Sequence, residues 1–167
     1  LKQVPWRRIV NVAAVVLVIA ISLPLLIHTV PQTVGADQSY VVTSGSMEPA
    51  MDPGDIIIVE SADPSTIGEG DVITFGARGS TTTHRVIDVI QEDGSLAFET
   101  KGDNNEDPDP ALVRPDDVQG KVMNVGGQLL VIPYIGYVIQ FANTQVGFVT
   151  LFAVPLVLLV VSEIWNV

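Results

Sequence analysis

Residues 41–59 read VVTSGSMEPAMDPGDIIIV. A run of β-type residues breaks at Ser44, crosses a turn and resumes after Gly54. Gly45 permits a tight backbone geometry, and Pro49 prevents a strand from continuing through the turn. The serines are therefore expected at an exposed turn between two strands, although Ser, Gly and Pro are also the ordinary residues of a plain polar loop.

The same pattern extends outward in both directions. Short runs rich in Val, Ile and Thr alternate with turn signals such as Asp52-Pro53-Gly54 and Glu92-Asp93-Gly94. Strands with turns at roughly 8 to 12 residue spacing predict a mainly β domain, an antiparallel sandwich or small barrel. The expected strands are Gln38 to Val42, Asp55 to Glu60, Asp71 to Phe75, Thr82 to Gln91, Leu96 to Thr100 and Val118 to Val125.

Two apolar segments flank this β domain, and the first lies near the N-terminus. Ile9 to Ile27 runs 19 residues without a charge, which at ~1.5 Å per residue is enough to cross a bilayer. Because Lys2, Arg7 and Arg8 precede it, the positive-inside rule places the start of the chain in the cytoplasm and the β domain outside. A basic start and an apolar run also imitate a cleavable leader, so a soluble secreted protein is the alternative.

The second apolar segment follows Lys121, and no charged residue occurs between Lys121 and Glu163. Its last part, Val146 to Trp165, is expected to return through the membrane, with a buried or lipid-surface helix as the alternative. Residues 126–144 suit a strand leading to an interfacial segment. The predicted organisation is an anchor over residues 1–30, an extracytoplasmic β domain over 31–145 and a C-terminal transmembrane helix over 146–167.

Composition narrows the classes of function. The chain has 167 residues, enough for one domain with a modest core. Its formal net charge of -11 argues against nucleic acid as a partner, and the lack of cysteine excludes disulfides and thiolate metal sites. With only 2 histidines, no metal or other cofactor is expected. The acids are dispersed, which suits a halophilic protein better than an acidic docking surface, because molar salt screens surface carboxylates beyond ~3 Å.

Hydrolytic chemistry needs a nucleophile, a base and a group that orients the base. His84 is the one histidine between the apolar segments, and imidazole is the natural proton acceptor at neutral pH. The acidic run Lys101 to Pro110, KGDNNEDPDP, supplies carboxylates, although such a run is also typical of a solvated loop or a weak calcium site. Taken singly, His84 in TTTHRVIDVI also fits an ordinary strand residue.

Six segments in order resemble the conserved boxes of type I signal peptidases, and they cover most of residues 40–140. The histidine in the fourth box, where bacterial enzymes have a lysine, is similar to the archaeal and endoplasmic-reticulum branch. The boxes are Ser44-Gly45-Ser46-Met47-Glu48-Pro49, Pro53 to Val59, Gly70 to Phe75, Thr83-His84-Arg85-Val86-Ile87, Thr100-Lys101-Gly102-Asp103-Asn104-Asn105 and Ile132 to Tyr137.

This resemblance implies a membrane-bound serine endopeptidase. Ser46 would be the nucleophile and His84 the general base. Asp109 would orient His84, Asp103 would be a second important acid, and Asp107 remains open as the orienting group. The backbone N–H of Ser46 and the hydroxyl of Ser44 would form the oxyanion hole.

The implied substrates are signal peptides of secretory preproteins, with small residues near the cut. They would be cleaved outside the membrane, beside lipid and the protein translocation machinery. Met47 and Ile56 to Ile58 are candidate pocket residues, and Arg85 would either oppose protonation of His84 or pair with an acid such as Asp88. The alternatives are a Ser/Lys peptidase using Lys101 or Lys121, and a non-catalytic, calcium-dependent acidic β domain.

Overall fold

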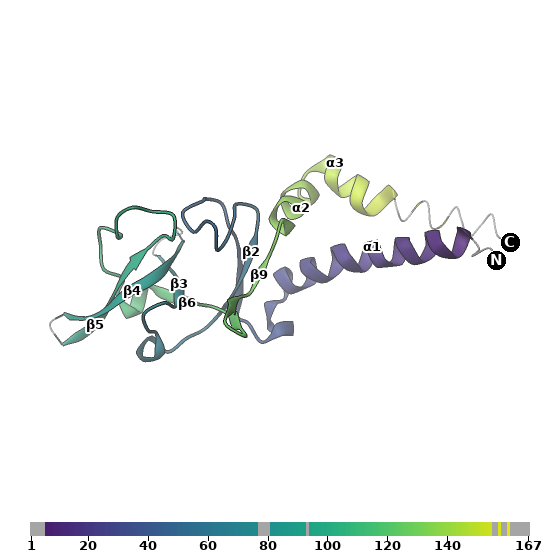
Figure 1. Cartoon of the computed structure of the whole chain (residues 1–167). Coiled ribbons are helices and arrows are strands. Elements are labelled where there is room, and N and C mark those ends of the chain that lie inside the picture. Colours follow the sequence, from purple (N-terminus) through teal and green to yellow (C-terminus); the bar gives the residue numbers. More distant parts are fainter. Residues whose placement is uncertain (1–5, 77–80, 93, 155–156, 158–159, 161–167) are drawn as a thin grey trace, which may run out of the picture.

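The structure is a computed structural model that describes residues 6–76, 81–92, 94–154, 157 and 160. It consists of an antiparallel sheet with helices at one end (Figure 1). The strands are β1 (Gln38–Val41), β2 (Ile56–Glu60), β3 (Val72–Phe75), β4 (Thr82–Glu92), β5 (Ser95–Lys101), β6 (Val118–Val122), β7 (Asn124–Val125), β8 (Gln128–Leu129) and β9 (Val131–Ile132). The helices are α1 (Trp6–Thr29), α2 (Ile135–Ala142) and α3 (Gln145–Phe148), with short helical turns at Pro31–Val34, Pro64–Thr66, Pro115–Asp117 and Val149–Ala153.

The main sheet confirms the prediction of a mainly antiparallel β fold. Its 7 strands run in the order β1-β2-β6-β3-β4-β5, with β9 beside the start of β2. The predicted strands are found in place, with ends that differ by a few residues. The exception is Val118 to Val125, which divides at Met123 into β6 and β7, because Gly126 and Gly127 turn the chain with positive φ into the β7–β8 hairpin.

Strand β2 is deeply buried, with apolar side chains on both faces. Ile57 and Val59 pack on one face with Met47 and Met51, which come from the turn that the sequence analysis singled out. Ile56 and Ile58 lie in a different cluster, against α2 and the end of α1. These four β2 side chains are at most 1 % exposed, and each such burial stabilises the fold by roughly 1.5 to 3 kcal/mol. The serine turn and α2 are thus held on opposite faces of one strand.

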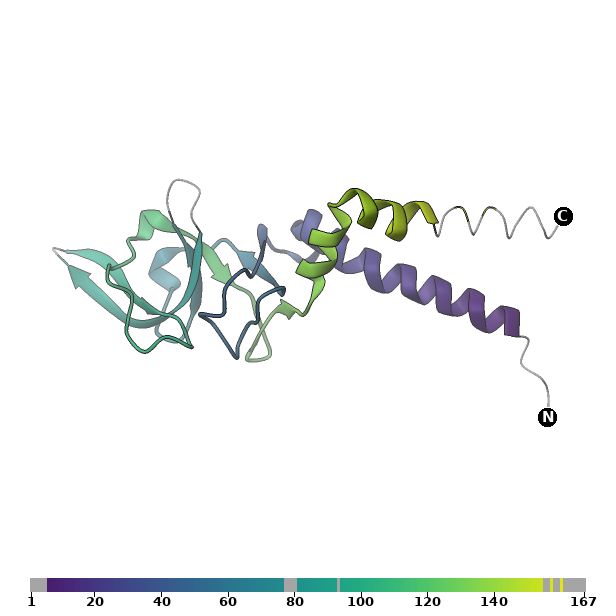
Figure 2. The same ribbon diagram turned by 90° about the horizontal axis from the view of Figure 1, so that it is seen from above.

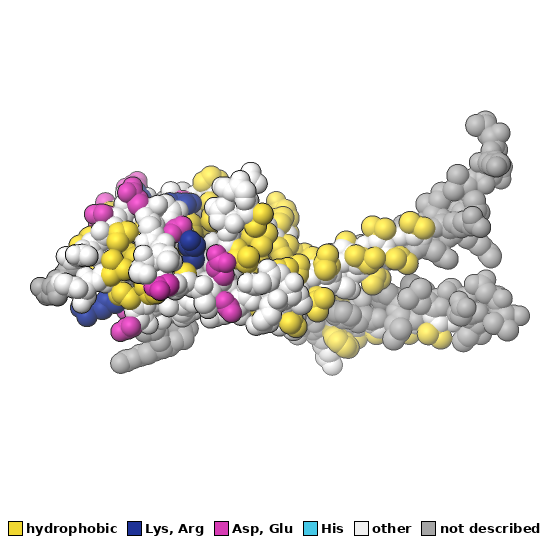
Figure 3. Space-filling view, turned by 90° about the horizontal axis from the view of Figure 1, so that it is seen from below, with side chains coloured by type: hydrophobic (Ala, Val, Ile, Leu, Met, Phe, Trp, Pro, Cys, Tyr) yellow, Lys and Arg dark blue, Asp and Glu magenta, His cyan; other side chains and the backbone are white. Residues whose placement is uncertain are grey.

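The helices extend away from the sheet. Helix α1 projects from the β1 end, and α2 and α3 follow β9 on the same side (Figures 1 and 2). Apolar side chains cover much of the described helical surface, whereas the acidic and basic ones gather over the sheet (Figure 3). Val12, Ile19 and Leu23 of α1 are each more than half exposed.

The two predicted membrane spans are not supported by the described residues. Helix α1 contains the first segment, residues 9–27, whereas the second, residues 146–167, lies in part outside the described residues. Within the part of the chain that the structure describes, no helix combines the length and the apolar character needed to cross a bilayer. The interfacial segment expected after residue 126 forms β8, β9 and α2.

Candidate active site

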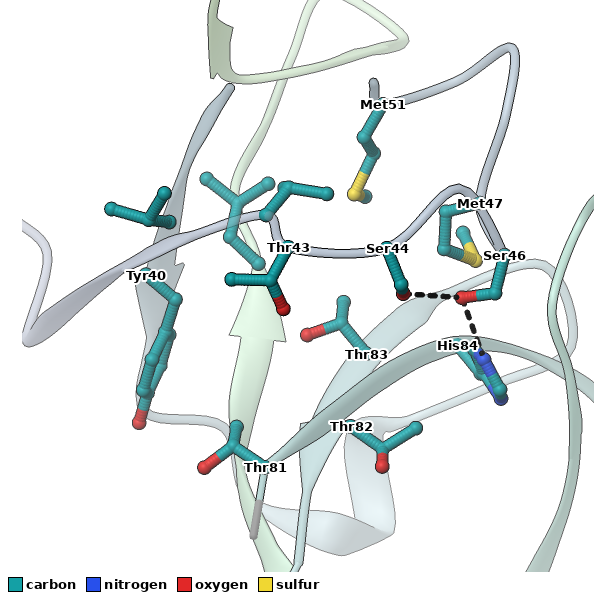
Figure 4. Close-up of a pocket in the computed structure, with 13 residues that line it drawn as sticks. Tyr40, Thr43, Ser44, Ser46, Met47, Met51, Thr81, Thr82, Thr83 and His84 are labelled. Carbon is teal, nitrogen blue, oxygen red and sulfur yellow. Dashed lines mark hydrogen bonds between the residues drawn. The ribbon is translucent and has the colours of Figure 1, made fainter. Parts of the chain in front are cut away.

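Ser46 lies in the segment between β1 and β2, residues 42–55, which we call the serine loop. The loop leaves the sheet through a continued ladder, in which Val42 N–H donates to the Asp55 carbonyl at 2.8 Å and Gly54 N–H donates to the Val42 carbonyl at 2.9 Å. Buried Met47 and Met51 fix the middle of the loop to the core. With its neighbour anchored in this way, the Ser46 hydroxyl points toward β4 (Figure 4).

His84 lies on β4 and faces Ser46. It pairs with Ile73 across the β3–β4 ladder, and its ring meets the Phe75 ring edge-on at a centroid distance of 6.3 Å. His84 is only 7 % exposed. Its Nε2 lies 3.1 Å from Ser46 Oγ and its Nδ1 lies 2.6 Å from Asp109 Oδ2.

Asp109 comes from the loop after β5 and is fixed by Thr100. The Asp109 N–H donates to the Thr100 carbonyl at 2.8 Å, and the Thr100 hydroxyl donates to Asp109 Oδ2 at 2.6 Å. An ionised carboxylate only accepts hydrogen bonds, so Nδ1 of His84 carries the hydrogen and Nε2 presents its lone pair to Ser46. Thr100, which is fully buried, begins the fifth box, but the sequence analysis gave it no role.

Asp103 pairs with Arg85, whereas His84 pairs with Asp109. Its two carboxylate oxygens accept from Arg85, Oδ1 from Nε at 2.8 Å and Oδ2 from Nη2 at 2.6 Å. This hydrogen bonding to Asp103 raises the pKa of Arg85. Asp88, the partner suggested from the sequence, instead accepts from the Val89 N–H. Asp103 therefore holds the acidic loop, by which we mean residues 102–110 after β5, against β4 beside His84.

The residues next to Asp103 hold the backbone at Ser46. Asn104 N–H donates to the Ser46 carbonyl at 2.9 Å, and its side-chain amide donates to the Gly45 carbonyl at 3.1 Å. A Cβ on Gly102 would lie 2.6 Å from the Ser46 carbonyl oxygen, so the acidic loop approaches this closely only with glycine there. The loop after β5 thus carries Asp109 and also holds the backbone at Ser46 and the strand that carries His84.

The other candidate groups take different partners. Lys101 Nζ donates to the Glu106 carbonyl at 3.0 Å, and Lys121 Nζ lies 3.5 Å from Asp71. Asp109, rather than Asp107, is the carboxylate that meets His84. Within the described residues, no three His, Cys, Asp or Glu side chains are grouped so that they could hold a metal ion.

A cavity of about 340 Å³ opens beside Ser46 and His84 (Figure 4). Ser44 lies at its rim, and its hydroxyl is 3.4 Å from that of Ser46. Of the residues suggested as pocket walls, Met47 and Ile57 line the cavity, whereas Ile56 and Ile58 face the opposite side of β2. The lining residues are Tyr40, Val41, Val42, Thr43, Ser44, Ser46, Met47, Met51, Ile57, Thr81, Thr82, Thr83 and His84.

Comparison with known proteins reveals named relatives. No protein-family profile matches the chain. The chain is 43 % identical over 82 residues to Signal peptidase I W of Bacillus subtilis, covering 48 % of this chain and 43 % of the relative. It is 36 % identical over 107 residues to the Signal peptidase complex catalytic subunit SEC11C of Homo sapiens, covering 62 % and 56 %.

A second human relative is the Putative signal peptidase complex catalytic subunit SEC11B, which is 34 % identical over 106 residues, or 61 % of this chain and 64 % of the relative. The chain spans about half the length of the curated relatives it matches. The bacterial and mammalian relatives are all named as signal peptidases or their catalytic subunits. These relatives support similarity to the type I signal peptidases of the eukaryotic and archaeal branch.

Proposed function

We propose that the protein is a serine endopeptidase that removes N-terminal signal peptides from secretory preproteins, with Ser46, His84 and Asp109 as its catalytic residues. The observation that carries the proposal is the continuous chain of hydrogen bonds from the Ser46 hydroxyl through the His84 ring to the Asp109 carboxylate. The named relatives support the choice of signal peptides as substrates.

In the proposed reaction, Ser46 Oγ attacks the scissile carbonyl while its proton passes to His84 Nε2. The tetrahedral intermediate then collapses, the peptide C–N bond breaks, and the leaving amine takes the proton from His84. Water attacks the acyl ester with His84 again as base, and Ser46 is regenerated with its proton. Asp109 holds the Nδ1–H tautomer and stabilises the imidazolium in both steps.

The oxyanion that forms in each step needs donors near Ser46. We assign this role to the Ser46 N–H and the Ser44 hydroxyl, because the two serine hydroxyls lie 3.4 Å apart at the cavity rim. Loss of one such donor costs ~3 to 4 kcal/mol of barrier, about 10² to 10³ in rate. Ser44→Ala is therefore expected to be slow and Ser46→Ala inactive.

The cavity beside Ser46 suits the residues that precede a cut. Its Met47, Met51 and Ile57 walls are apolar and its Thr81–Thr83 side is polar, so an apolar side chain and a polar backbone can both be accommodated there. We propose that it holds the substrate residues on the acyl side of the scissile bond.

The proposal includes attachment to the membrane, with the β domain on the extracytoplasmic side next to lipid and the translocation machinery. The uncharged runs at residues 9–27 and 146–162 support two spans, and the exposed Val12, Ile19 and Leu23 side chains of α1 support contact with lipid. Resistance to alkaline extraction, together with protease access to the β domain from outside, is expected. Release into the wash would contradict membrane integration but not the peptidase activity.

The decisive experiment is cleavage of a preprotein in detergent, at physiological and at molar salt, by the wild type and Ser46→Ala. Ser95→Ala is the matched control, because this serine is exposed at the start of β5. Loss of cleavage in Ser46→Ala alone is expected. Equal turnover by Ser46→Ala and wild type would refute the mechanism.

A further inference from the structure

The serine loop is held from outside the sheet by helix α2. The Gly136 N–H donates to the Gly54 carbonyl at 2.8 Å. A Cβ on Gly136 would lie 2.6 Å from that carbonyl oxygen, and a Cβ on Gly54 would lie 2.1 Å from the Tyr137 ring. The backbone contact leaves no room for a side chain at Gly136, the positive φ of +93 favours glycine at Gly54, and α2 packs directly on the backbone of the serine loop.

Asp55 joins the same two elements through its side chain. It is 5 % exposed, and its Oδ2 accepts from the Asp52 N–H at 2.9 Å within the loop. Its Oδ1 accepts from the N–H of Tyr134 at 3.1 Å, and Tyr134 is the residue that precedes α2. One buried carboxylate thus links the loop that carries Ser46 to the start of the helix.

The turn at Gly70-Asp71 has the same form as the turn at Gly54-Asp55, but no bond from its aspartate to α2 occurs among the described residues. Gly70-Asp71 precedes β3 as Gly54-Asp55 precedes β2, and the two glycines have φ of +90 and +93. Asp71 Oδ2 also accepts from the N–H three residues earlier, that of Gly68, at 3.0 Å. Its further partner is Lys121 at 3.5 Å. The turn forms without a helix, so the contact of Asp55 with α2 serves something else.

We propose that α2 positions the serine loop for reaction, with Asp55 as the positioning residue that connects them. The inference rests on the proposed role of Ser46 as nucleophile. Ser46 Oγ and His84 Nε2 lie 3.1 Å apart, so a shift of the loop by about 1 Å breaks their hydrogen bond. Displacing α2 therefore lowers turnover while the sheet remains folded.

The first test compares Asp55→Asn with Asp71→Asn in the full-length chain in detergent, using a preprotein substrate. Asparagine keeps the shape but offers one acceptor oxygen in place of two, so Asp55→Asn loses either the loop bond or the α2 bond. We expect kcat to fall about tenfold or more in Asp55→Asn, with KM within about twofold of wild type, because the cavity walls are untouched. Asp71→Asn is expected to keep the wild-type kcat.

The second test reaches the same contact from the helix side. Gly136→Ala places a methyl group against the Gly54 carbonyl, whereas Gly68→Ala meets no atom within 4 Å and has no positive φ. Gly136→Ala is expected to lower kcat as Asp55→Asn does, and Gly68→Ala to have no effect. The double variant Asp55→Asn/Gly136→Ala should lose little more than either single one, because both act on one contact.

A third measurement does not depend on activity. The chain has 2 histidines, so the ring signals of ¹⁵N-histidine-labelled protein can be assigned with a His28→Gln variant. The His84 signals are expected to move in Asp55→Asn and Gly136→Ala but not in the two controls. If Ser46→Ala retained activity, the proposed function would fail while the His84 signals would still report on the α2 contact.

The proposal is overturned if kcat and the His84 signals of Asp55→Asn and Gly136→Ala match those of the wild type. It is also overturned if both variants lose the circular-dichroism signal of the sheet, since Asp55 and Gly136 would then maintain the fold instead of the site.

Discussion

The Thr100 hydroxyl and the His84 Nδ1–H donate to the same oxygen, Oδ2 of Asp109, each at 2.6 Å. Thr100 is fully buried and His84 nearly so, so this oxygen is shielded and its orientation is set by two donors at once. The direction in which Asp109 presents its charge to the imidazole therefore depends on a threonine that never reaches the substrate cavity.

Replacing Thr100 by valine removes that donor and keeps the side-chain shape. We expect Thr100→Val to lower the free energy of unfolding by about 1.5 to 3 kcal/mol, the usual value for a hydrogen bond to a charged group. Turnover is expected to fall about tenfold, because Asp109 is held less firmly. Thermal melting and preprotein cleavage measure the two effects. Thr74→Val is a suitable control, since Thr74 is equally buried but bonds the Thr83 hydroxyl; equal losses in both variants would argue against a specific role for Thr100.

Asp103 and Asp109, both in the loop after β5, are expected to affect kcat to different degrees. Asp109→Asn leaves the site's shape intact but favours the wrong tautomer of His84, and a fall in kcat of about 10³ to 10⁴ follows. Asp103→Asn weakens the two bonds to Arg85 and loosens the loop, so the loss of kcat should be much smaller. Steady-state kinetics of the two variants side by side decide the matter. A larger loss in Asp103→Asn would make Asp103 the more important acid.

The Ser/Lys alternative predicts a different pair of results. Lys101 Nζ is bonded to the Glu106 carbonyl, so Lys101→Met should keep turnover within about threefold of wild type. His84→Gln removes the proposed base and should leave only residual cleavage. Activity lost in Lys101→Met but kept in His84→Gln would establish lysine as the base.

Asp37 provides a test of pH-dependent stability away from the site. The Ser61 N–H donates to Asp37 Oδ2 at 2.8 Å, and this bond, together with the Ser61 side chain, lowers the pKa of Asp37. A lowered pKa in the folded state means that Asp37 stabilises the fold above its ordinary pKa and loses this contribution as the pH falls through the folded value.

Asp37→Asn is therefore expected to melt below the wild type at about pH 7, with a smaller difference at about pH 3. Ser61→Ala keeps the backbone donor and should show only a minor part of the difference. A melting difference that is equal at both pH values would show that charge is not involved.

The strands could be predicted from the sequence because their signals are local. Val and Ile runs bounded by Gly-Asp turns fix β2 and β3 within a residue, and Pro49 and Gly45 mark the serine loop. The resemblance of the boxes singled out Ser46, His84 and Asp109, which the structure brings together. Their catalytic roles stay predictions.

The remaining features depend on contacts between distant residues. The resemblance favoured Asp109 by its spacing from Asp103 and left Asp107 open, and in the structure Asp109, whose N–H is bonded to the Thr100 carbonyl, is the one that meets His84. Asp88 was suggested as a partner of Arg85, but Arg85 pairs with Asp103 from the loop after β5, a contact that depends on how that loop folds back. The contacts of α2 with Gly54 and Asp55 leave no pattern in the sequence, because a glycine in a turn looks the same whether or not a ring packs on it.

The order in which the site's parts occur along the chain has a consequence for biosynthesis. The serine appears early, the histidine follows within the sheet, and the acid and its threonine arrive only with the end of β5 and the loop beyond it. Since Asn104 from that late loop also fastens the Ser46 backbone, a chain that has emerged only through β4 carries a serine and a histidine without the means to align them. Under the proposed function, the incomplete chain would therefore stay inactive during synthesis because of its topology.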